Sequence, residues 1–216
     1  MNKEASPARS AILRLSNLVV EKKGQIICQL KSLVVAHGSY VSVTGPNGSG
    51  KSTLLRVISG LETEFQGQFE IDISPRDCAF VPQDPLMFRG SAAYNVEYPL
   101  IARGMPALQR RSQVQQMLRE FGLTELKDKN AKSLSGGEKK RIAFARAVIY
   151  EPKILLLDEP FAELDSIATN HLIHYLNQSD KTVFITSPKL DSNLSTSAQQ
   201  VELSSHQHSD PADQRQ

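Results

Sequence analysis

Short runs of apolar and β-branched residues, bounded by turns, fill the beginning of the chain. The runs Leu13–Val20, Gln25–Ile27 and Leu33–Val35 lie between polar stretches, with turn glycines at Gly24 and Gly38. Runs of this length and composition are typical of strands. The pattern therefore predicts a small antiparallel β subdomain of short strands.

The next part of the chain mixes strand and helix patterns. Tyr40–Val43 predicts a strand, and Leu54–Ile58 predicts a helix that Gly60 ends with a left-handed residue. Phe69–Ile73 and Cys78–Val81 predict two more strands, which we interpret as a small hairpin region.

From Leu86 to Lys132 the apolar residues recur at helical spacing until Gly122 interrupts them. The residues that carry this spacing are Leu108, Val114, Met117, Leu118 and Phe121. This pattern predicts a helical insertion. Another helix is predicted over Lys139–Tyr150, and Pro152 ends it.

The C-terminal part alternates strand and helix. Lys153–Pro160 is apolar enough for a strand buried on both faces, as in a parallel sheet. A helix over Ser166–Gln178, a strand over Thr182–Thr186 and a last strand over Gln200–Leu203 follow. We therefore predict an α/β fold with a mainly parallel sheet, an antiparallel β subdomain at its N-terminal side and a helical insertion.

At 216 residues the chain suits one globular domain. We expect that domain to span residues 11–205, with a helical subdomain at about 86–150 and flexible tails at 1–10 and 206–216. Lys and Arg number 25 against 23 Asp and Glu, a balance that argues against nucleic acid as a partner.

Neither a signal-peptide core nor an apolar run of about 20 residues occurs in the sequence. We therefore expect a cytoplasmic protein that reaches a membrane only through a partner. Cys28 and Cys78 lie apart in apolar runs, so we interpret them as core residues in a reducing compartment.

The strongest chemical signal is a glycine-rich loop that matches G-x-x-x-x-G-K-[ST] between a predicted strand and a predicted helix. It comprises Gly45, Pro46, Asn47, Gly48, Ser49, Gly50, Lys51, Ser52 and Thr53. In such a loop the backbone N–H groups bind phosphate, an exposed Lys51 reaches the β- and γ-phosphates, and Ser52 offers its hydroxyl to Mg²⁺. The sequence thus predicts binding of ATP with Mg²⁺; the alternative is a simple glycine-rich turn.

Two further motifs follow. Ser135 and Glu138 fit a capping box, and Gly136 and Gly137 leave helix N–H groups accessible, so this helix start is a second candidate anion site. Asp158-Glu159 places two carboxylates at the end of a predicted parallel strand, where open α/β sheets bind ligands. The alternative interpretation of Asp158-Glu159 is a polar strand exit.

The order of these motifs across residues 13–203 resembles the ATP-binding cassette (ABC) ATPases, the nucleotide-binding subunits of ABC transporters. The resemblance implies that Asp158 supports the Mg²⁺ shell and that Glu159 polarises the attacking water. It also implies that Gln83 contacts Mg²⁺ or that water, and that Asp165 lies at a dimer interface. With Ser135 to Gly137 as the family's signature, each copy would complete the ATP site of another.

As a transporter subunit, the chain is expected to form a homodimer or heterodimer of ATPase subunits. It would bind an integral-membrane permease at the inner face of the cell membrane and power transport by ATP hydrolysis. The stretches Phe88–Gly90 and Asn95–Leu100 resemble importers of oxyanions such as phosphate or tungstate. The alternative is a helical lobe that packs its own aromatic residues.

The sequence departs from the family at three places. The family's adenine-stacking aromatic residue is replaced by Lys22 and Lys23, so we expect weak nucleotide discrimination or a cation against the base. Ser187 stands where the family has a histidine that contacts the γ-phosphate, which implies slow hydrolysis. Glu138 replaces a common glutamine without removing the anion-binding groups.

Two other functions remain open from the sequence. One is a soluble ABC-type ATPase that acts on nucleic acid or ribosomes, although such relatives generally carry two cassettes or a long coiled coil. The other is a nucleotide-switched regulatory module with slow turnover, which the replaced histidine favours.

Overall fold

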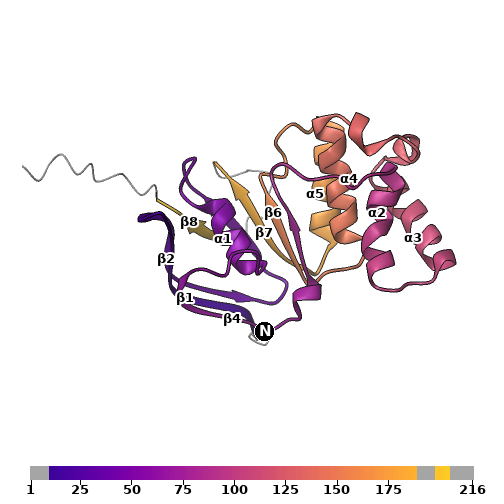
Figure 1. Ribbon diagram of the computed structural model, residues 1–216. Helices are drawn as coiled ribbons and strands as arrows, with labels where there is room; N and C mark the ends of the chain where they lie inside the picture. The colour runs from indigo at the N-terminus through magenta and orange to yellow at the C-terminus, as the bar shows by residue number, and fades with distance from the viewer. Residues whose placement is uncertain (1–9, 189–197, 205–216) are drawn as a thin grey trace, which may run out of the picture.

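The computed structural model of the protein describes residues 10–188 and 198–204. Of the expected tails at 1–10 and 206–216, only Ser10 lies within the described residues. Figure 1 shows two parts: strands with helix α1 on one side, and helices α2 to α5 gathered on the other. The central parallel strands lie between the two parts.

The predicted antiparallel subdomain is present and has three strands in the order β2-β1-β4. They are β1 (Ala11–Lys22), β2 (Gln25–Ala36) and β4 (Gln66–Ile71). The prediction of two strands within 25–36 was wrong, because β2 is continuous and pairs with β1 from Gln25 to Ala36. The ladder to β1 holds the polar middle of β2, including exposed Lys31, in strand conformation despite its low apolar content.

The second sheet is parallel throughout and has five strands in the order β5-β6-β7-β3-β8. Its strands are β3 (Tyr40–Thr44), β5 (Cys78–Val81), β6 (Ile154–Asp158), β7 (Thr182–Ser187) and β8 (Gln199–Glu202). The predicted α/β fold class is confirmed. The predicted hairpin region was wrong, because β4 and β5 belong to different sheets and do not pair with each other.

Five α-helices are described: α1 (Lys51–Ile58), α2 (Ala92–Ala102), α3 (Ala107–Glu120), α4 (Gly136–Val148) and α5 (Ser166–Gln178). Short 3₁₀ turns lie at Pro75–Asp77, Thr124–Leu126 and Ala131–Ser133. The helical insertion is thus two helices, divided at Gly104 (φ 72°), and the break at Gly122 (φ 60°) is confirmed. The helix predicted over 139–150 begins earlier, because Ser135 caps it.

The parallel sheet separates two hydrophobic cores. Leu155 and Leu157 of β6 pack with the helical side, whereas Ile154 and Leu156 pack with α1 and the antiparallel sheet. Since neighbouring residues of a strand point to opposite faces, one apolar run contributes to both cores. This double burial fixes the end of β6, and with it the position of Asp158.

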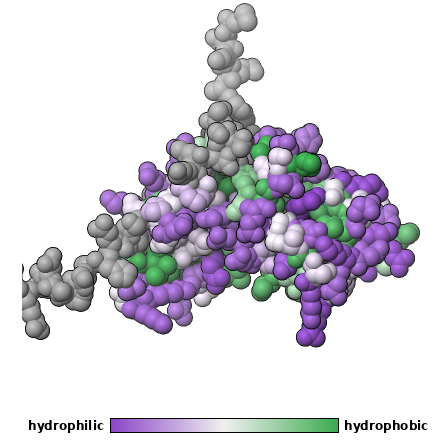
Figure 2. Space-filling view, turned by 90° about the horizontal axis from the view of Figure 1, so that it is seen from above, coloured by the Kyte–Doolittle hydropathy of each residue, from purple (hydrophilic) through white to green (hydrophobic). Residues whose placement is uncertain are grey.

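The outer surface carries both hydrophilic and apolar residues. The face in Figure 2 is mostly hydrophilic, and apolar residues show in a few separate patches. Among the described residues, no helix combines the length and the apolar character needed to cross a bilayer.

Candidate functional site

The glycine-rich loop connects β3 to α1 and ends at Gly50, which caps α1 with a φ of 91°. A Cβ atom at this position would lie 2.4 Å from Ile27 O and 2.7 Å from Cys28 Cβ. The loop therefore runs directly against β2 and requires glycine here for both conformation and space. This packing aims the start of α1 into the adjoining cavity.

Lys51 was predicted to be exposed, and that prediction was wrong. Its side chain is 6 % exposed, and Nζ donates to Gly45 O at 2.9 Å and to Pro46 O at 3.0 Å. The loop carbonyls satisfy an ammonium group that the fold has removed from water. The lysine is thereby held inside the loop, close to where phosphate oxygens would bind.

A cavity of about 270 Å³ opens beside this loop. It is lined by Asn47, Gly48, Gly50, Lys51, Ser52, Thr53, Gln83 and Glu159, together with Ile27. Of the predicted site residues, Gly45, Pro46, Ser49, Asp158 and the three residues 135–137 do not line it. Gly45 and Pro46 still contribute through the carbonyls that hold Lys51, whereas Ser49 is buried.

The two acidic residues at the end of β6 lie in different environments. Asp158 is 5 % exposed, whereas Glu159 lines the cavity and has a left-handed φ of 47°. Gln83 Nε2 donates to Glu159 Oε2 at 3.1 Å. The structure thus brings Gln83 and Glu159 together across the cavity from the loop, although they lie far apart in the sequence.

Thr186 connects the two acidic residues and was missed by sequence reasoning. Its hydroxyl donates to Asp158 Oδ1 at 2.6 Å and accepts from the Glu159 N–H at 2.9 Å. Thr186 lies opposite Asp158 in the register of β6 and β7, and it is 1 % exposed. The only sequence signal was a hydroxyl residue at the end of an apolar strand, beside the strand that carries Asp158.

The donor set of this site fits Mg²⁺ and a triphosphate. Ser52 and Gln83 line the cavity and offer hydroxyl and amide oxygens, which are hard ligands of the kind Mg²⁺ prefers. The buried Asp158 carboxylate lies next to Glu159 at the end of β6, outside the cavity lining. Backbone N–H groups at the start of α1 and the ammonium of Lys51 suit phosphate oxygens. Within the described residues, no cluster of three or more His, Cys, Asp or Glu side chains suggests a different metal centre.

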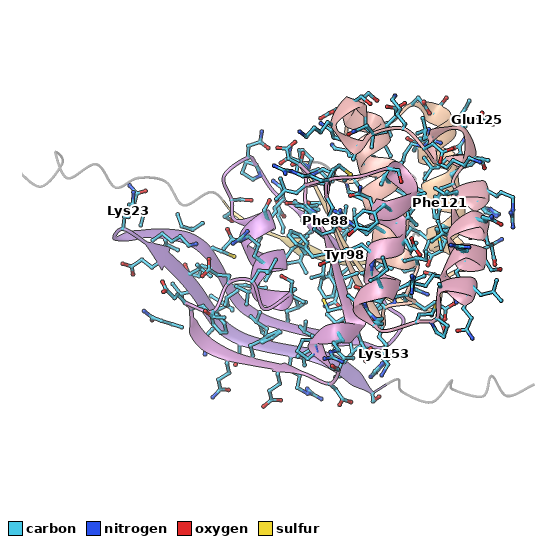
Figure 3. The ribbon with its side chains drawn as sticks, turned by 45° about the vertical axis from the view of Figure 1, so that its right-hand side comes forward. Lys23, Phe88, Tyr98, Phe121, Glu125 and Lys153 are labelled. Carbon is cyan, nitrogen blue, oxygen red and sulfur yellow. The ribbon has the colours of Figure 1, made fainter. Side chains whose placement is uncertain are left out.

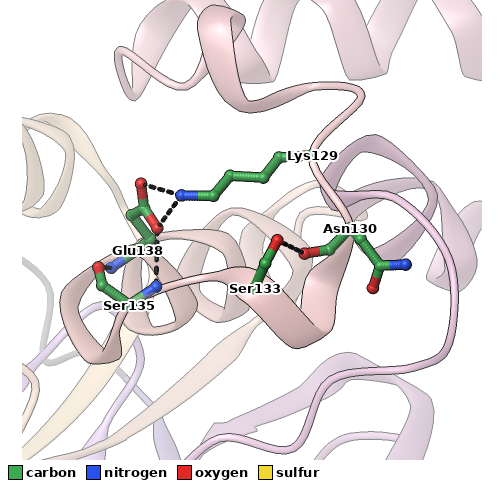
Figure 4. A network of polar contacts seen from close by, with 5 residues as sticks. All are labelled: Lys129, Asn130, Ser133, Ser135 and Glu138. Carbon is green, nitrogen blue, oxygen red and sulfur yellow. Dashed lines mark hydrogen bonds and ion pairs between the residues drawn. The ribbon is translucent and has the colours of Figure 1, made fainter.

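The second candidate anion site is the start of α4, where the predicted capping box is present. Ser135 Oγ accepts from the Glu138 N–H at 3.3 Å, and the Ser135 N–H donates to Glu138 Oε2 at 2.7 Å. Lys129 Nζ contacts Glu138 Oε1 at 2.9 Å and Oε2 at 2.8 Å (Figure 4). Lys129 lowers the pKa of Glu138 chiefly by this hydrogen bond, and the Ser135 N–H adds to the effect.

Two other positions singled out by the sequence have structural partners. Asp165 Oδ1 caps α5 by accepting from the Ala168 N–H at 2.7 Å. Lys22 forms an ion pair with Glu62, whereas Lys23 lies at the tip of the β1–β2 hairpin with a φ of 55°. Figure 3 shows Lys23 standing clear of the rest of the chain. The capping of α5 is thus the observed role of Asp165.

Both cysteines are free thiols, as the sequence led us to expect for core residues. Burial raises the pKa of the Cys28 thiol to about 11 and that of Cys78 to about 12. Thiols with such pKa values remain protonated and unreactive at neutral pH.

A groove with exposed apolar residues follows Gln83. It has a volume of about 330 Å³ and is lined by Pro85, Leu86, Met87, Phe88, Arg89, Ala131, Lys132 and Lys139. Leu86 is 85 % exposed, and the Phe88 ring lies 4.2 Å from the Tyr98 ring (Figure 3). Asn95, which is fully buried, fixes Phe88 by accepting from its N–H at 2.8 Å and donating to its carbonyl at 3.1 Å.

Comparison with known proteins adds an independent finding. The sequence model described as "ABC transporter" matches residues 29–162, more than half of the chain. The tungstate uptake system ATP-binding protein TupC of Peptoclostridium acidaminophilum is 35 % identical over 83 % of this chain and 88 % of its own length. A probable sulfate/thiosulfate import ATP-binding protein CysA of Chlorella vulgaris is 37 % identical over 72 % of each chain.

Solved structures agree on the fold. A bacterial Atm1-family ABC exporter with ATP bound superposes with a TM-score of 0.77 at 26 % identity, covering 92 % of this chain and 38 % of that one. The cbiO1 protein of Clostridium perfringens, part of the ABC transporter complex cbiONQ, gives a TM-score of 0.69 at 27 % identity. This match covers 83 % of this chain and 79 % of the cbiO1 chain.

Proposed function

We propose, from the premise that this chain belongs to the ABC transporter family of ATP-binding proteins, that it is the ATPase subunit of a transporter with a separate permease. The observation that carries this proposal is the cavity in which the phosphate-binding loop meets Glu159 and Gln83. That site offers a phosphate cradle and a carboxylate facing it, which together suit hydrolysis of a triphosphate.

Each residue has a defined part in this proposal. Ser52 and Gln83 would hold Mg²⁺ and Asp158 would support its shell, and the bound ion would supply positive charge against the phosphates. Lys51 and the N–H groups at the start of α1 orient the terminal phosphate, and Glu159 polarises the water that attacks it. Gln83 holds the Glu159 carboxylate at 3.1 Å and aims it across the cavity.

The proposal includes a head-to-tail dimer. The start of α4 does not line the cavity of its own chain, yet it carries N–H groups suited to phosphate. In a dimer, Ser135, Gly136 and Gly137 of one copy would close the ATP site of the other. The partner is a second copy of this chain or a related ATPase subunit.

The groove after Gln83 is the proposed contact with the permease. Leu86 and Phe88 are exposed there, and basic residues line the same groove. Only a few residues separate the groove from Gln83, and the Gln83 side chain contacts Glu159. One segment therefore connects binding at the groove with chemistry at Glu159. The names of the tungstate and sulfate relatives support import of an oxyanion as the transported class.

Dimer trapping tests the ATPase proposal. Glu159→Gln keeps the shape of the side chain but removes the base, so MgATP should bind and hold a closed dimer. Size-exclusion chromatography with MgATP measures the oligomeric state, and the exposed Glu125→Gln is the control. A Glu159→Gln protein that binds nucleotide yet stays monomeric would contradict the shared site.

A pair of leucines tests the permease contact. Leu86 and Leu108 are 85 % and 82 % exposed, but only Leu86 lines the groove. Leu86→Asp should prevent co-purification with the co-expressed permease in detergent, whereas Leu108→Asp should not. Equal recovery of the permease with both variants would place the contact elsewhere.

A further inference from the structure

Two carboxylates lie next to the proposed second phosphate site, where their negative charge would repel an incoming phosphate. Glu138 is the third residue of α4, and its Oε2 atom accepts from the Ser135 N–H at 2.7 Å. Glu163 lies against Gly136, where an added Cβ would come within 2.4 Å of Glu163 Oε2. A phosphate that approached this helix start would meet both carboxylates.

Each of these carboxylates has a lysine of its own. Lys129 Nζ contacts both oxygens of Glu138, at 2.9 and 2.8 Å. Lys140 Nζ lies 3.6 Å from Glu163 Oε1 and also donates to Ala162 O at 2.9 Å. The charges around the start of α4 are therefore balanced in pairs.

We propose that Lys129 is a positioning residue that neutralises Glu138 and so keeps the start of α4 attractive to phosphate. This inference rests on the proposed function, because it assumes that the start of α4 binds the phosphate of another copy. The capping box uses the N–H groups of Ser135 and Glu138, which leaves those of Gly136 and Gly137 for an incoming anion. Without Lys129, the full negative charge of Glu138 would stand beside these donors.

The backbone around Lys129 holds the lysine in place. The Ala92 N–H donates to Lys129 O at 2.9 Å, and the Ala131 N–H donates to Gly90 O at 2.9 Å. The Ser133 hydroxyl donates to Asn130 O at 2.8 Å (Figure 4). The first two bonds connect the segment before α4 to the start of α2, and the third stabilises the segment itself. The backbone of Lys129 is therefore fixed, and its ammonium group lies against Glu138.

Two single substitutions separate neutralisation from simple bracing. Lys129→Met and Glu138→Gln both break the same ion pair, but they shift the local charge in opposite directions. If the pair serves only to brace the helix start, both variants should weaken dimer formation equally. If Lys129 serves to neutralise Glu138, only Lys129→Met should weaken it.

The measurement is made in the Glu159→Gln background, by size-exclusion chromatography across a series of MgATP concentrations. Lys129→Met should raise the MgATP concentration for half-maximal dimer by about three- to tenfold, as expected for one unscreened charge near a partly exposed site. Glu138→Gln should cause no rise, and Lys129→Met/Glu138→Gln should return to within about twofold of the parent. Binding of MgATP to the monomer should be the same in all variants.

Lys127→Met is the matched control, since it removes the same charge two residues away, where Nζ lies 3.9 Å from Asp128. Equal weakening by Lys129→Met and Glu138→Gln would overturn the inference, as would failure of the double variant to recover. A Glu159→Gln protein that does not dimerise at all would instead refute the shared site, and the inference would fall with it.

Discussion

The Thr186 hydroxyl donates to Asp158 Oδ1 at 2.6 Å and accepts from the Glu159 N–H at 2.9 Å. One side chain thus fixes both the rotamer of the proposed metal-shell carboxylate and the backbone that aims the proposed base. The second bond matters because Glu159 has a left-handed φ of 47°, a conformation that costs a residue with a side chain about 1–3 kcal/mol. Thr186 is the natural target for the first prediction.

Thr186→Val should lower the ATP hydrolysis rate by about 10- to 100-fold, since it removes a hydrogen bond to a charged group while keeping the side-chain shape. The Mg²⁺ concentration for half-maximal activity should rise as well, because Asp158 loses its fixed orientation. Steady-state ATPase assays across a Mg²⁺ titration measure both. Thr186→Ser keeps the hydroxyl and is the control; if it loses as much activity as Thr186→Val, the hydrogen bonds are not the cause.

Lys51→Ala should abolish ATP binding, because the loop loses its only charged contact to the terminal phosphates. The buried position of Lys51 changes the expected effect on the fold: two hydrogen bonds to loop carbonyls are lost, so we expect destabilisation of about 1–2 kcal/mol. Calorimetric titration with MgATP and thermal unfolding measure the two effects. Lys31→Ala, at an exposed position of β2, should change neither, and retained MgATP affinity in Lys51→Ala would refute the proposed site.

Ser135→Arg should block dimer formation by Glu159→Gln, because the guanidinium would occupy the proposed second phosphate site. Binding of MgATP to the monomer should persist, since Ser135 does not line the cavity of its own chain. Size-exclusion chromatography and a nucleotide-binding assay separate these outcomes. Thr124→Arg, which adds the same side chain at an exposed turn of the helical part, should leave the dimer intact.

Ser187→His should raise the turnover number by about tenfold or more with little change in ATP affinity, because a positioned imidazole commonly contributes 10²- to 10⁴-fold. Ser187 ends β7 and pairs in register with Thr44, which leads into the phosphate-binding loop. Steady-state ATPase assays across ATP concentrations measure the turnover number, and calorimetric titration measures the ATP affinity. Pro188 restricts the backbone of the preceding residue, so a structure of the variant belongs to the test. An imidazole that reaches the γ-phosphate without faster turnover would show that Ser187 does not limit the rate.

Acid should destabilise the parent more steeply than Glu138→Gln. Lys129 and the Ser135 N–H lower the pKa of Glu138 in the folded state below the value of about 4.3 for an unfolded chain. A lowered folded pKa gives stability that is present above the unfolded pKa and is lost as the pH falls through the folded pKa. Urea unfolding between pH 6 and pH 3 should therefore show that the free energy of unfolding falls less in Glu138→Gln than in the parent. The difference should be about what one titrating group contributes. Glu125→Gln is the control, and parallel curves for the parent and Glu138→Gln would contradict the prediction.

The local elements that the sequence predicted well carry their own signals. The end of β6, the capping box at Ser135 and the helix over 166–178 each combine an apolar pattern with a nearby cap or turn residue. The wrong predictions of strands fall where pairing with another strand decides the structure. Pairing with β1 joins the polar middle of β2 into one strand. On its other side β1 pairs with β4, which places β4 in the antiparallel sheet.

The sequence by itself determined the α/β fold class, the phosphate-binding loop and the order of the motifs, because each depends on residues close together along the chain. Only the tertiary structure decided that Lys51 is buried, that Thr186 joins Asp158 to Glu159, and that Lys129 is paired with Glu138. These relationships depend on which strands are neighbours in the sheet and on how loops from different elements pack. The Thr186 hydrogen bonds join residues 27 and 28 positions apart. The contacts of Lys51 and Lys129 span only five to nine positions, but they form once the surrounding elements have packed, so no sequence pattern alone encodes them.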